Sequence, residues 1–290
     1  MKYPVPTTFS IVAVDRATGE IGVAVQSKFL SVGAAVPFVR AGVGAVATQA
    51  FCNTTFGPRG LALLAGGNSP QEALDTMLAD DEGREDRQVG IVDLHGNAAT
   101  FTGANCIAAA GGIAGDDFAV QGNCLAAAGV YEAMAATFRS STGTLADRLV
   151  AVLAAAQAEG GDKRGQQSAA LIIEKPQGGY GGFNDRYVDL RVDDHPHPID
   201  ELARILELHK LYFFPPAPED VYPIDDALGA EIVRELIRIG ALPASAVAFD
   251  ETVAAALTAF MHIENLENRC RDDGAIDRQT LEYLRGYVSS

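Results

Sequence analysis

The chain has 290 residues, of which 48% are hydrophobic and 21% are charged, and its formal net charge at pH 7 is −16. This length accommodates one large domain, or one medium and one small domain. The acidic balance, without a clustered basic surface, excludes a nucleic-acid partner because phosphate binding requires such a surface. We find neither an apolar run long enough for a bilayer nor a signal-peptide pattern. We therefore expect no membrane partner and a cytoplasmic location.

The residues before the first proline-rich segment alternate between hairpins and pairs of helices. Strands are predicted at Thr8–Asp15, Ile21–Ser27, Val36–Arg40, Val43–Gln49, Gln88–Asp93, Ala98–Thr102, Phe118–Asn123, Ser168–Ile173 and Tyr187–Val192. Helices are predicted after Gly57, after the capping box Ser69–Glu72, over Val130–Phe138 and Leu145–Leu153, and over Ile199–Leu211.

Consecutive strands join through turns that are too short for a parallel crossover, so the sheets must be antiparallel. Helices that arrive in pairs can cover the outer faces of two such sheets. The pattern therefore predicts an α+β fold, a four-layer αββα sandwich. The segment Pro215–Pro218 marks the boundary between a domain over residues 1–214 and a small three-helix domain over residues 219–290.

Seven separated segments between about residues 8 and 212, among them TFSIVAVD, NTTFGPRGL and GGDKRGQQSAAL, resemble an uncharacterised bacterial family. That family is classed with the N-terminal-nucleophile hydrolases. The resemblance implies the αββα sandwich and hydrolysis of an amide bond in a small amide or peptide, with no cofactor and no metal. Because paired hairpin sheets of this class usually associate, we also expect a homodimer.

The C-terminal residues resemble peptidoglycan-binding modules. Phe249–Thr252, Ala255–Phe260 and Gly274–Asp277 match the motif FD-x-x-T…A-x-x-x-F…DG, although Met261 replaces the usual glutamine after the phenylalanine. One interpretation is binding to cell-wall glycan. The other is a module that packs on the first domain or mediates assembly, and we favour it because wall binding requires export.

The hydrolase class uses a threonine, serine or cysteine at the mature N-terminus, and the resemblance assigns this role to Thr8. Its hydroxyl would attack the amide and its own α-amine, with a pKa of about 7.7–8.0, would take the proton. Ser10 faces the same side of the strand and could assist. Seven residues precede Thr8, so its nitrogen is an amide. Either the Thr7–Thr8 bond is cleaved, or the chain does not perform this chemistry.

Three further residues match supporting positions of that class. Lys28 would polarise the Thr8 hydroxyl, and Asp162 with Ser168 would support the nucleophile. The alternatives are a solvated lysine at the end of a strand and two residues that cap a helix end and a strand start.

Amide and guanidinium groups supply the remaining candidates. The Asn123 side chain, or backbone N–H groups at Ala47–Gln49, would stabilise an oxyanion. Candidate substrate-binding residues are Ser10, Gln49, Asn53, Arg59 and Gln121. Arg59 would bind a carboxylate. The alternative interpretations are that the amide groups form hydrogen bonds in turns and that Arg59 forms a surface salt bridge.

One other feature, a pair of histidines, is a weaker signal. His195 and His197 are separated by a proline and lack a third ligand in a typical zinc spacing, so we interpret them as a surface loop rather than a metal site. Two functions remain open: an amidohydrolase that uses Thr8, and a non-catalytic ligand-binding or scaffold protein that keeps the sandwich.

Overall fold

The computed structural model describes residues 5–288, and contacts divide the chain into two compact units, Met1–Leu206 and Glu207–Ser290. This division falls within helix α5 (Pro198–Phe213), before the proline-rich segment. Each unit has its own hydrophobic core. The larger unit contains the residues that matter for the candidate site.

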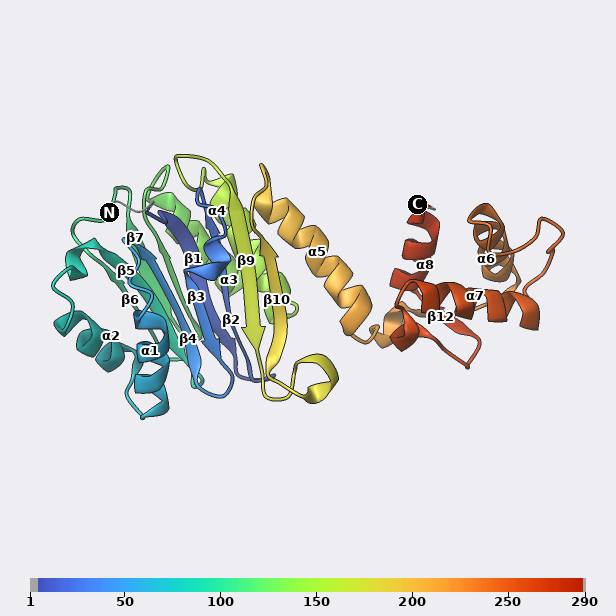
Figure 1. Cartoon of the computed structure of the whole chain (residues 1–290), viewed down its shortest axis with the longest axis horizontal. Helices are drawn as coiled ribbons and strands as arrows, with labels where there is room; N and C mark the ends of the chain where they lie inside the picture. Colours follow the sequence, from blue (N-terminus) through green and yellow to red (C-terminus); the bar gives the residue numbers. More distant parts are fainter. Residues whose placement is uncertain (1–4, 289–290) are drawn as a thin grey trace. The chain divides into compact units, whose positions relative to one another are not determined.

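Two antiparallel sheets form the larger unit (Figure 1). In their order across it, the six strands of the first sheet are β10 (Arg186–Val192), β9 (Ser168–Glu174), β2 (Glu20–Ser27), β1 (Thr8–Asp15), β8 (Phe118–Gly122) and β7 (Gly111–Gly115). The four strands of the second sheet are β3 (Pro37–Arg40), β4 (Gly44–Ala50), β5 (Arg87–Asp93) and β6 (Ala98–Thr102).

Helices cover the outer face of each sheet. Helices α1 (Phe56–Ala65) and α2 (Pro70–Ala79) contact the second sheet, while α3 (Gly129–Ser140) and α4 (Leu145–Ala158) contact the first. Ser69 begins α2 with a complete capping box, because its hydroxyl accepts from the Glu72 backbone and the Glu72 carboxylate accepts from the Ser69 backbone. The two sheets contact each other through their inner faces. The predicted order of helix pairs and sheets is therefore present in this mixed α/β unit.

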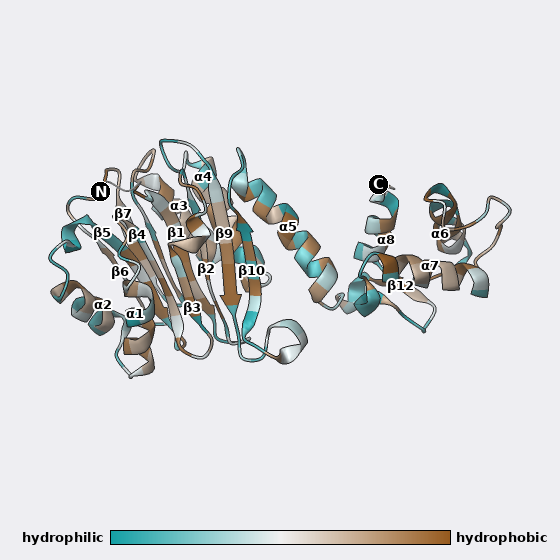
Figure 2. Cartoon of the chain, viewed as in Figure 1, coloured by the Kyte–Doolittle hydropathy of each residue, from teal (hydrophilic) through white to brown (hydrophobic). Residues whose placement is uncertain are grey.

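The alternating direction of side chains along the strands explains why the sheets pack together. Val12 and Val14 of β1 lie with Val23 and Val25 of β2 in a buried cluster that also includes residues of the second sheet. Since successive side chains of a strand point to opposite faces, the intervening residues face the helices. Figure 2 shows hydrophobic residues concentrated along central strands such as β9, whereas the surface helix α5 alternates between hydrophobic and hydrophilic residues.

In its described part, the smaller unit contains the end of α5, three further helices and a short two-stranded sheet. These elements are α6 (Asp226–Arg238), α7 (Glu251–Ile263), α8 (Arg278–Gly286), β11 (Val221–Pro223) and β12 (Ala275–Asp277). Its core contains a fully buried ion pair in which Arg269 Nη1 lies 3.1 Å from Asp277 Oδ1. Arg269 also donates to the Leu211 carbonyl at 2.8 Å, which fixes the start of the unit to its centre.

Two structural elements were not expected from the sequence. Strand β7 has the sequence GGIAG, and glycine and alanine carry little strand propensity. The β11–β12 pair adds a sheet to the expected three-helix domain, and its strands are only three residues long.

The short helical turns are η1 (Val32–Ala34), η2 (Arg84–Asp86), η3 (Tyr180–Gly182), η4 (Pro218–Asp220) and η5 (Glu267–Arg269).

Candidate functional site

Thr8 is the first residue of β1 and is fully buried. Its hydroxyl donates to the Pro6 carbonyl at 2.6 Å and lies 3.1 Å from the hydroxyl of Ser27. The β1–β2 register pairs Thr8 with Ser27, which explains their contact. Residues immediately before β1 therefore cover the Thr8 hydroxyl and supply its hydrogen-bond acceptor.

The carbonyl of Thr7, which belongs to the Thr7–Thr8 peptide bond, accepts two side-chain hydrogen bonds. Ser27 Oγ donates to this oxygen at 2.6 Å, and Arg164 Nη2 donates at 2.8 Å. Charge-assisted hydrogen bonds of this kind are stronger than neutral ones. Negative charge that develops on the Thr7 oxygen would therefore be stabilised by a hydroxyl and a guanidinium group.

Asp162 holds Arg164 in position to bind this carbonyl. Its side chain is fully buried and accepts from Arg164 Nη2 at 2.7 Å and from Arg164 Nε at 3.1 Å. Burial alone would lower the pKa of Arg164, but the hydrogen bonds and charge of Asp162 outweigh it and the pKa is raised. Asp162 also accepts from the Lys28 backbone N–H at 3.3 Å and, weakly, from the Thr7 hydroxyl at 3.5 Å.

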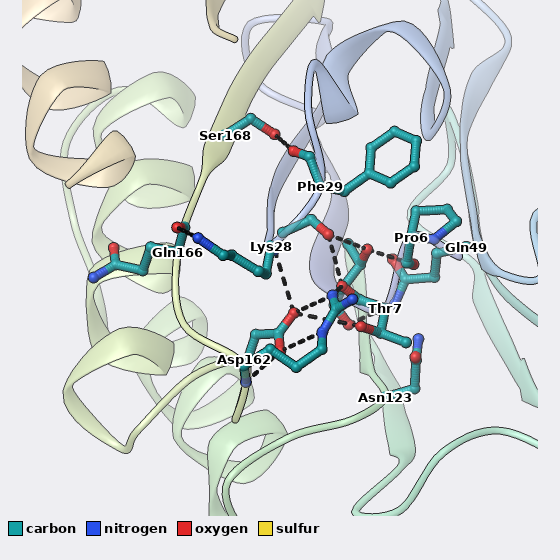
Figure 3. Close-up of polar contacts among 12 residues, drawn as sticks. Pro6, Thr7, Lys28, Phe29, Gln49, Asn123, Asp162, Gln166 and Ser168 are labelled. Atoms are coloured by element: carbon teal, nitrogen blue, oxygen red, sulfur yellow. Dashed lines mark hydrogen bonds and ion pairs between the residues drawn. The ribbon is translucent and has the colours of Figure 1, made fainter. Parts of the chain in front are cut away.

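The Lys28 side chain is directed away from this cluster. Its ammonium group donates to the Gln166 carbonyl at 3.2 Å, so the backbone of Lys28, and not its charge, contacts the candidate site (Figure 3). Ser168 donates to the Phe29 carbonyl and accepts from the Val32 backbone at 3.0 Å. Ser168 thus fixes the segment that follows β2 and makes no hydrogen bond to Thr8.

Five buried polar residues fill the space between the sheets beside Thr8, and we call them the amide cluster. They are Ser10, Gln49, Gln88, Gln121 and Asn123. Ser10 Oγ donates to Gln49 Oε1 at 2.6 Å, and Gln121 Nε2 donates to Ser10 Oγ at 2.6 Å. A Cβ atom at Gly90 would lie 2.0 Å from Gln121 Oε1, so glycine at this position leaves room for the Gln121 amide. The structure therefore brings together four residues that the sequence analysis proposed, and adds Gln88.

Backbone carbonyls fix the direction of the Gln88 amide, and through it the direction of Asn123. Gln88 Nε2 donates to the carbonyls of Gly122 at 2.8 Å and Gly111 at 3.2 Å, so its Oε1 must accept. That oxygen accepts from Gln49 Nε2 and from Asn123 Nδ2, both at 2.8 Å. Asn123 therefore uses its donor internally, and its buried Oδ1 has no partner among the described residues. Its Nδ2 carries a second N–H, so the oxyanion role that we expected for the Asn123 side chain stays a prediction.

A cavity of about 360 Å³ lies next to these residues. Its lining residues are Val5, Thr7, Ala50, Phe51, Asp86, Asn105, Cys106, Ile107 and Asn123. Thr7 and Asn123 thus connect the cavity to the candidate site, while Thr8 lies behind Thr7.

Asn53 and Arg59 lie outside the amide cluster. Arg59 forms an exposed ion pair with Asp80 at 2.8 Å, and Asn53 Nδ2 donates to Asp81 at 3.2 Å. Arg87 binds Asp81 through two nitrogens and also donates to the Phe51 carbonyl at the cavity wall. The two predicted substrate-binding residues therefore contact the loops around the second sheet.

Replacing Asp81 by asparagine is expected to lower the free energy of unfolding by about 2 kcal/mol at pH 7. Hydrogen bonds from Arg87, which outweigh the effect of burial, lower the pKa of Asp81 to about 2. Because the folded-state pKa is depressed, this stabilisation is present above the unfolded-state pKa of about 3.9 and is lost as the pH falls toward 2. Chemical denaturation at several pH values checks it, and a pH-independent difference would contradict the ion-pair explanation.

Two cysteine thiols are poor nucleophiles. Burial raises the pKa of Cys52 to about 11 and also raises the pKa of Cys106. Within residues 5–288, no group of three histidine, cysteine, aspartate or glutamate side chains gathers in a way that could hold a metal ion. In the same part of the chain, every helix is too short or too polar to cross a bilayer.

Sequence reasoning missed Thr7, Ser27, Gln88 and Arg164. The predicted hairpin over Thr8–Ser27 contained one usable signal, since a tight turn at Gly19 places Ser27 opposite Thr8. Glutamines at the ends of several strands were a second signal, because Gln49 pairs directly with Gln88. For Arg164 the sequence offered only its closeness to Asp162.

These features define a mixed α/β protein in which a buried hydroxyl and a partly exposed guanidinium group lie at one peptide bond. The chain belongs to a family of unknown function (DUF1028), whose family model matches residues 8–202. A second family model, described as "Putative peptidoglycan binding domain", matches residues 212–284. Both resemblances seen in the sequence, to an uncharacterised family and to a wall-binding module, are thereby confirmed.

A solved structure has a similar fold. The crystal structure of protein SPO2555 from Silicibacter pomeroyi, described as DUF1028, is 33% identical over 72% of this chain and 91% of that chain, with a TM-score of 0.65. No curated protein matches the chain.

Proposed function

We propose that the protein is an amide-bond hydrolase of the N-terminal-nucleophile type, which acts on a small amide or peptide through Thr8 after the Thr7–Thr8 bond is cleaved. The contact of Ser27 and Arg164 with the Thr7 carbonyl carries this proposal. These donors lie where an oxyanion would form if the Thr8 hydroxyl attacked the preceding carbonyl carbon. The layers of helices and sheets in the larger unit agree with the same class.

The cleavage proceeds in two steps. Thr8 Oγ1 forms a bond to the Thr7 carbonyl carbon, and the carbonyl electrons move to the oxygen that Ser27 and Arg164 bind. The bond from that carbon to the Thr8 nitrogen then breaks, and the nitrogen receives the proton that the hydroxyl loses. Water hydrolyses the resulting ester, which leaves a carboxylate on Thr7 and a free hydroxyl and amine on Thr8.

The free amine of Thr8 then serves as the general base when the Thr8 hydroxyl attacks the amide bond of the substrate. Asp162 holds Arg164 in position, and the amide cluster holds the start of β1 through the bond from Gln49 Nε2 to the Thr8 carbonyl at 3.2 Å. In this proposal, polarisation of Thr8 by Lys28 requires the lysine to leave the Gln166 carbonyl.

Intact-mass analysis of the purified full-length chain tests the proposal. We expect the wild-type protein to lose residues 1–7 during incubation, and Thr8→Ala to stay intact because it has no hydroxyl. Thr8→Ser and Thr7→Ala are the matched controls, and both keep the reacting groups and should be cleaved. Replacing Arg164 by glutamine should slow cleavage by about 10²–10³-fold. Permanent retention of residues 1–7 by the wild-type chain would refute the proposal.

A second candidate is a non-catalytic ligand-binding or scaffold protein, with cell-wall material as one possible ligand. Two observations favour it. The Thr8 hydroxyl donates its hydrogen bond to the Pro6 carbonyl, and residues 212–284 match the family model of a putative peptidoglycan-binding domain. An uncleaved chain that binds isolated cell-wall glycan would support this alternative. The homodimer and the cytoplasmic location stay predictions.

A further inference from the structure

The cavity beside Thr7 has mostly apolar walls and a small number of polar groups. Val5, Ala50, Phe51 and Ile107 contribute apolar surface, and the Phe51 and Ile107 side chains are each 48% exposed. Pockets of this type orient a ligand through the few polar groups in their walls. The chemistry of those polar groups therefore indicates the class of ligand.

Asp86 is the charged residue among those that line the cavity. Its carboxylate accepts one hydrogen bond, from Asn105 Nδ2 at 3.0 Å, and no ion pair to it is found among the described residues. The neighbouring Arg87 does not neutralise it, because the Arg87 guanidinium binds Asp81 and the Phe51 carbonyl. The cavity thus presents a negative charge that has no positive partner.

Asn123 adds a second acceptor to the same cavity. It lines the cavity, its side chain is fully buried, and its Oδ1 has no partner within residues 5–288. The carbonyls of Gly111 and Gly122 fix the orientation of Gln88, which in turn fixes that of Asn123. If the Asn123 amide exchanged the positions of its oxygen and nitrogen, Gln88 Oε1 would lose a hydrogen bond. An unpaired buried acceptor is costly and favours a ligand that donates an N–H group.

We propose that this cavity binds a small compound with a primary ammonium group and an apolar body, the ammonium group pairing with Asp86 and an N–H group donating to Asn123. The identification of this compound as the substrate, an amine-bearing amide, rests on the proposed hydrolase function. Binding itself does not require cleavage. The net charge of −16 on the whole chain also favours the approach of a cationic ligand.

Titration calorimetry of the Thr8→Ala protein, which cannot release residues 1–7 through its hydroxyl, tests the inference. The probes are 2-phenylethylamine, 2-phenylethanol and phenylacetate, which share one apolar body and differ in charge. We expect the amine to bind at least about tenfold more tightly than the alcohol, and phenylacetate to bind least. Asp86→Asn should weaken amine binding by about tenfold, since it keeps the shape of the side chain and removes its charge.

Asp80→Asn is the matched control, because Asp80 pairs with Arg59 away from the cavity and its removal should leave amine binding unchanged. Equal affinity for the three probes, or unchanged amine binding in Asp86→Asn, would overturn the inference. The comparison of three probes on one protein keeps the test decisive even if a variant folds poorly. Since cleavage is measured separately by mass, failure of amine binding and failure of the hydrolase proposal are distinguishable.

Discussion

Replacement of Arg164 by leucine is expected to lower the free energy of unfolding by about 2–4 kcal/mol at pH 7. Asp162 is fully buried, and this change would leave its carboxylate without a cationic partner. Backbone N–H groups of Lys28 and Arg164 would still donate to it, which keeps the loss below that of an entirely unpaired buried charge. Chemical denaturation followed by circular dichroism measures the difference.

Arg204→Leu is the control for removing an arginine. Arg204 pairs with Glu201 on the exposed face of α5, and pairs of this kind contribute about 0.3–0.5 kcal/mol. The double variant Arg164→Leu/Asp162→Asn should recover part of the lost stability, because it removes the buried charge as well as its partner. Equal losses in Arg164→Leu and Arg204→Leu would contradict the importance of burial at Asp162.

Replacement of Gln88 by leucine is expected to destabilise the fold by about 3–5 kcal/mol. Leucine is similar in size but removes the acceptor of Asn123 Nδ2 and one acceptor of Gln49 Nε2. It also removes the donor to the buried carbonyl of Gly122 and to the partly buried carbonyl of Gly111. Polar groups buried without partners carry their full desolvation cost.

Gln71→Leu on the exposed surface of α2 is the matched control and should change stability by less than about 0.5 kcal/mol. The Gln71 side chain donates to Asp75 on the same exposed helix face. If Gln88→Leu proved as stable as the wild-type chain, the amide cluster would have to be a tolerated set of polar residues rather than a connected network.

Local sequence patterns were sufficient to predict most of the secondary structure. The β-branched and apolar residues of Thr8–Asp15 predicted β1, and the capping box at Ser69 predicted the start of α2. Both signals operate within a few residues, so neighbouring residues contain the necessary information. Strand β7 lacked such a signal. Its residues Gly111 and Gly112 pack against Tyr131 and Thr100, which leave no room for a side chain and belong to other elements of the fold.

The candidate site depended on contacts that sequence reasoning could not see. Arg164 meets the Thr7 carbonyl across 157 positions of the chain, and Gln88 meets Asn123 across 35. The direction of the Lys28 side chain depends on where the Gln166 carbonyl lies, which no spacing within the chain indicates. Residue types near Thr8 were therefore predictable, whereas hydrogen-bond direction required the folded backbone.

The missing side chain at Gly90 has a consequence for how this family can diverge. Because a Cβ atom there would overlap the Gln121 amide, a larger residue at position 90 requires that amide to move or to be replaced. A relative that carries alanine at the first position should carry a shorter residue at the second. Since Gln121 also bonds Ser10, that exchange would spread to a third position, and these residues should be inherited as a set.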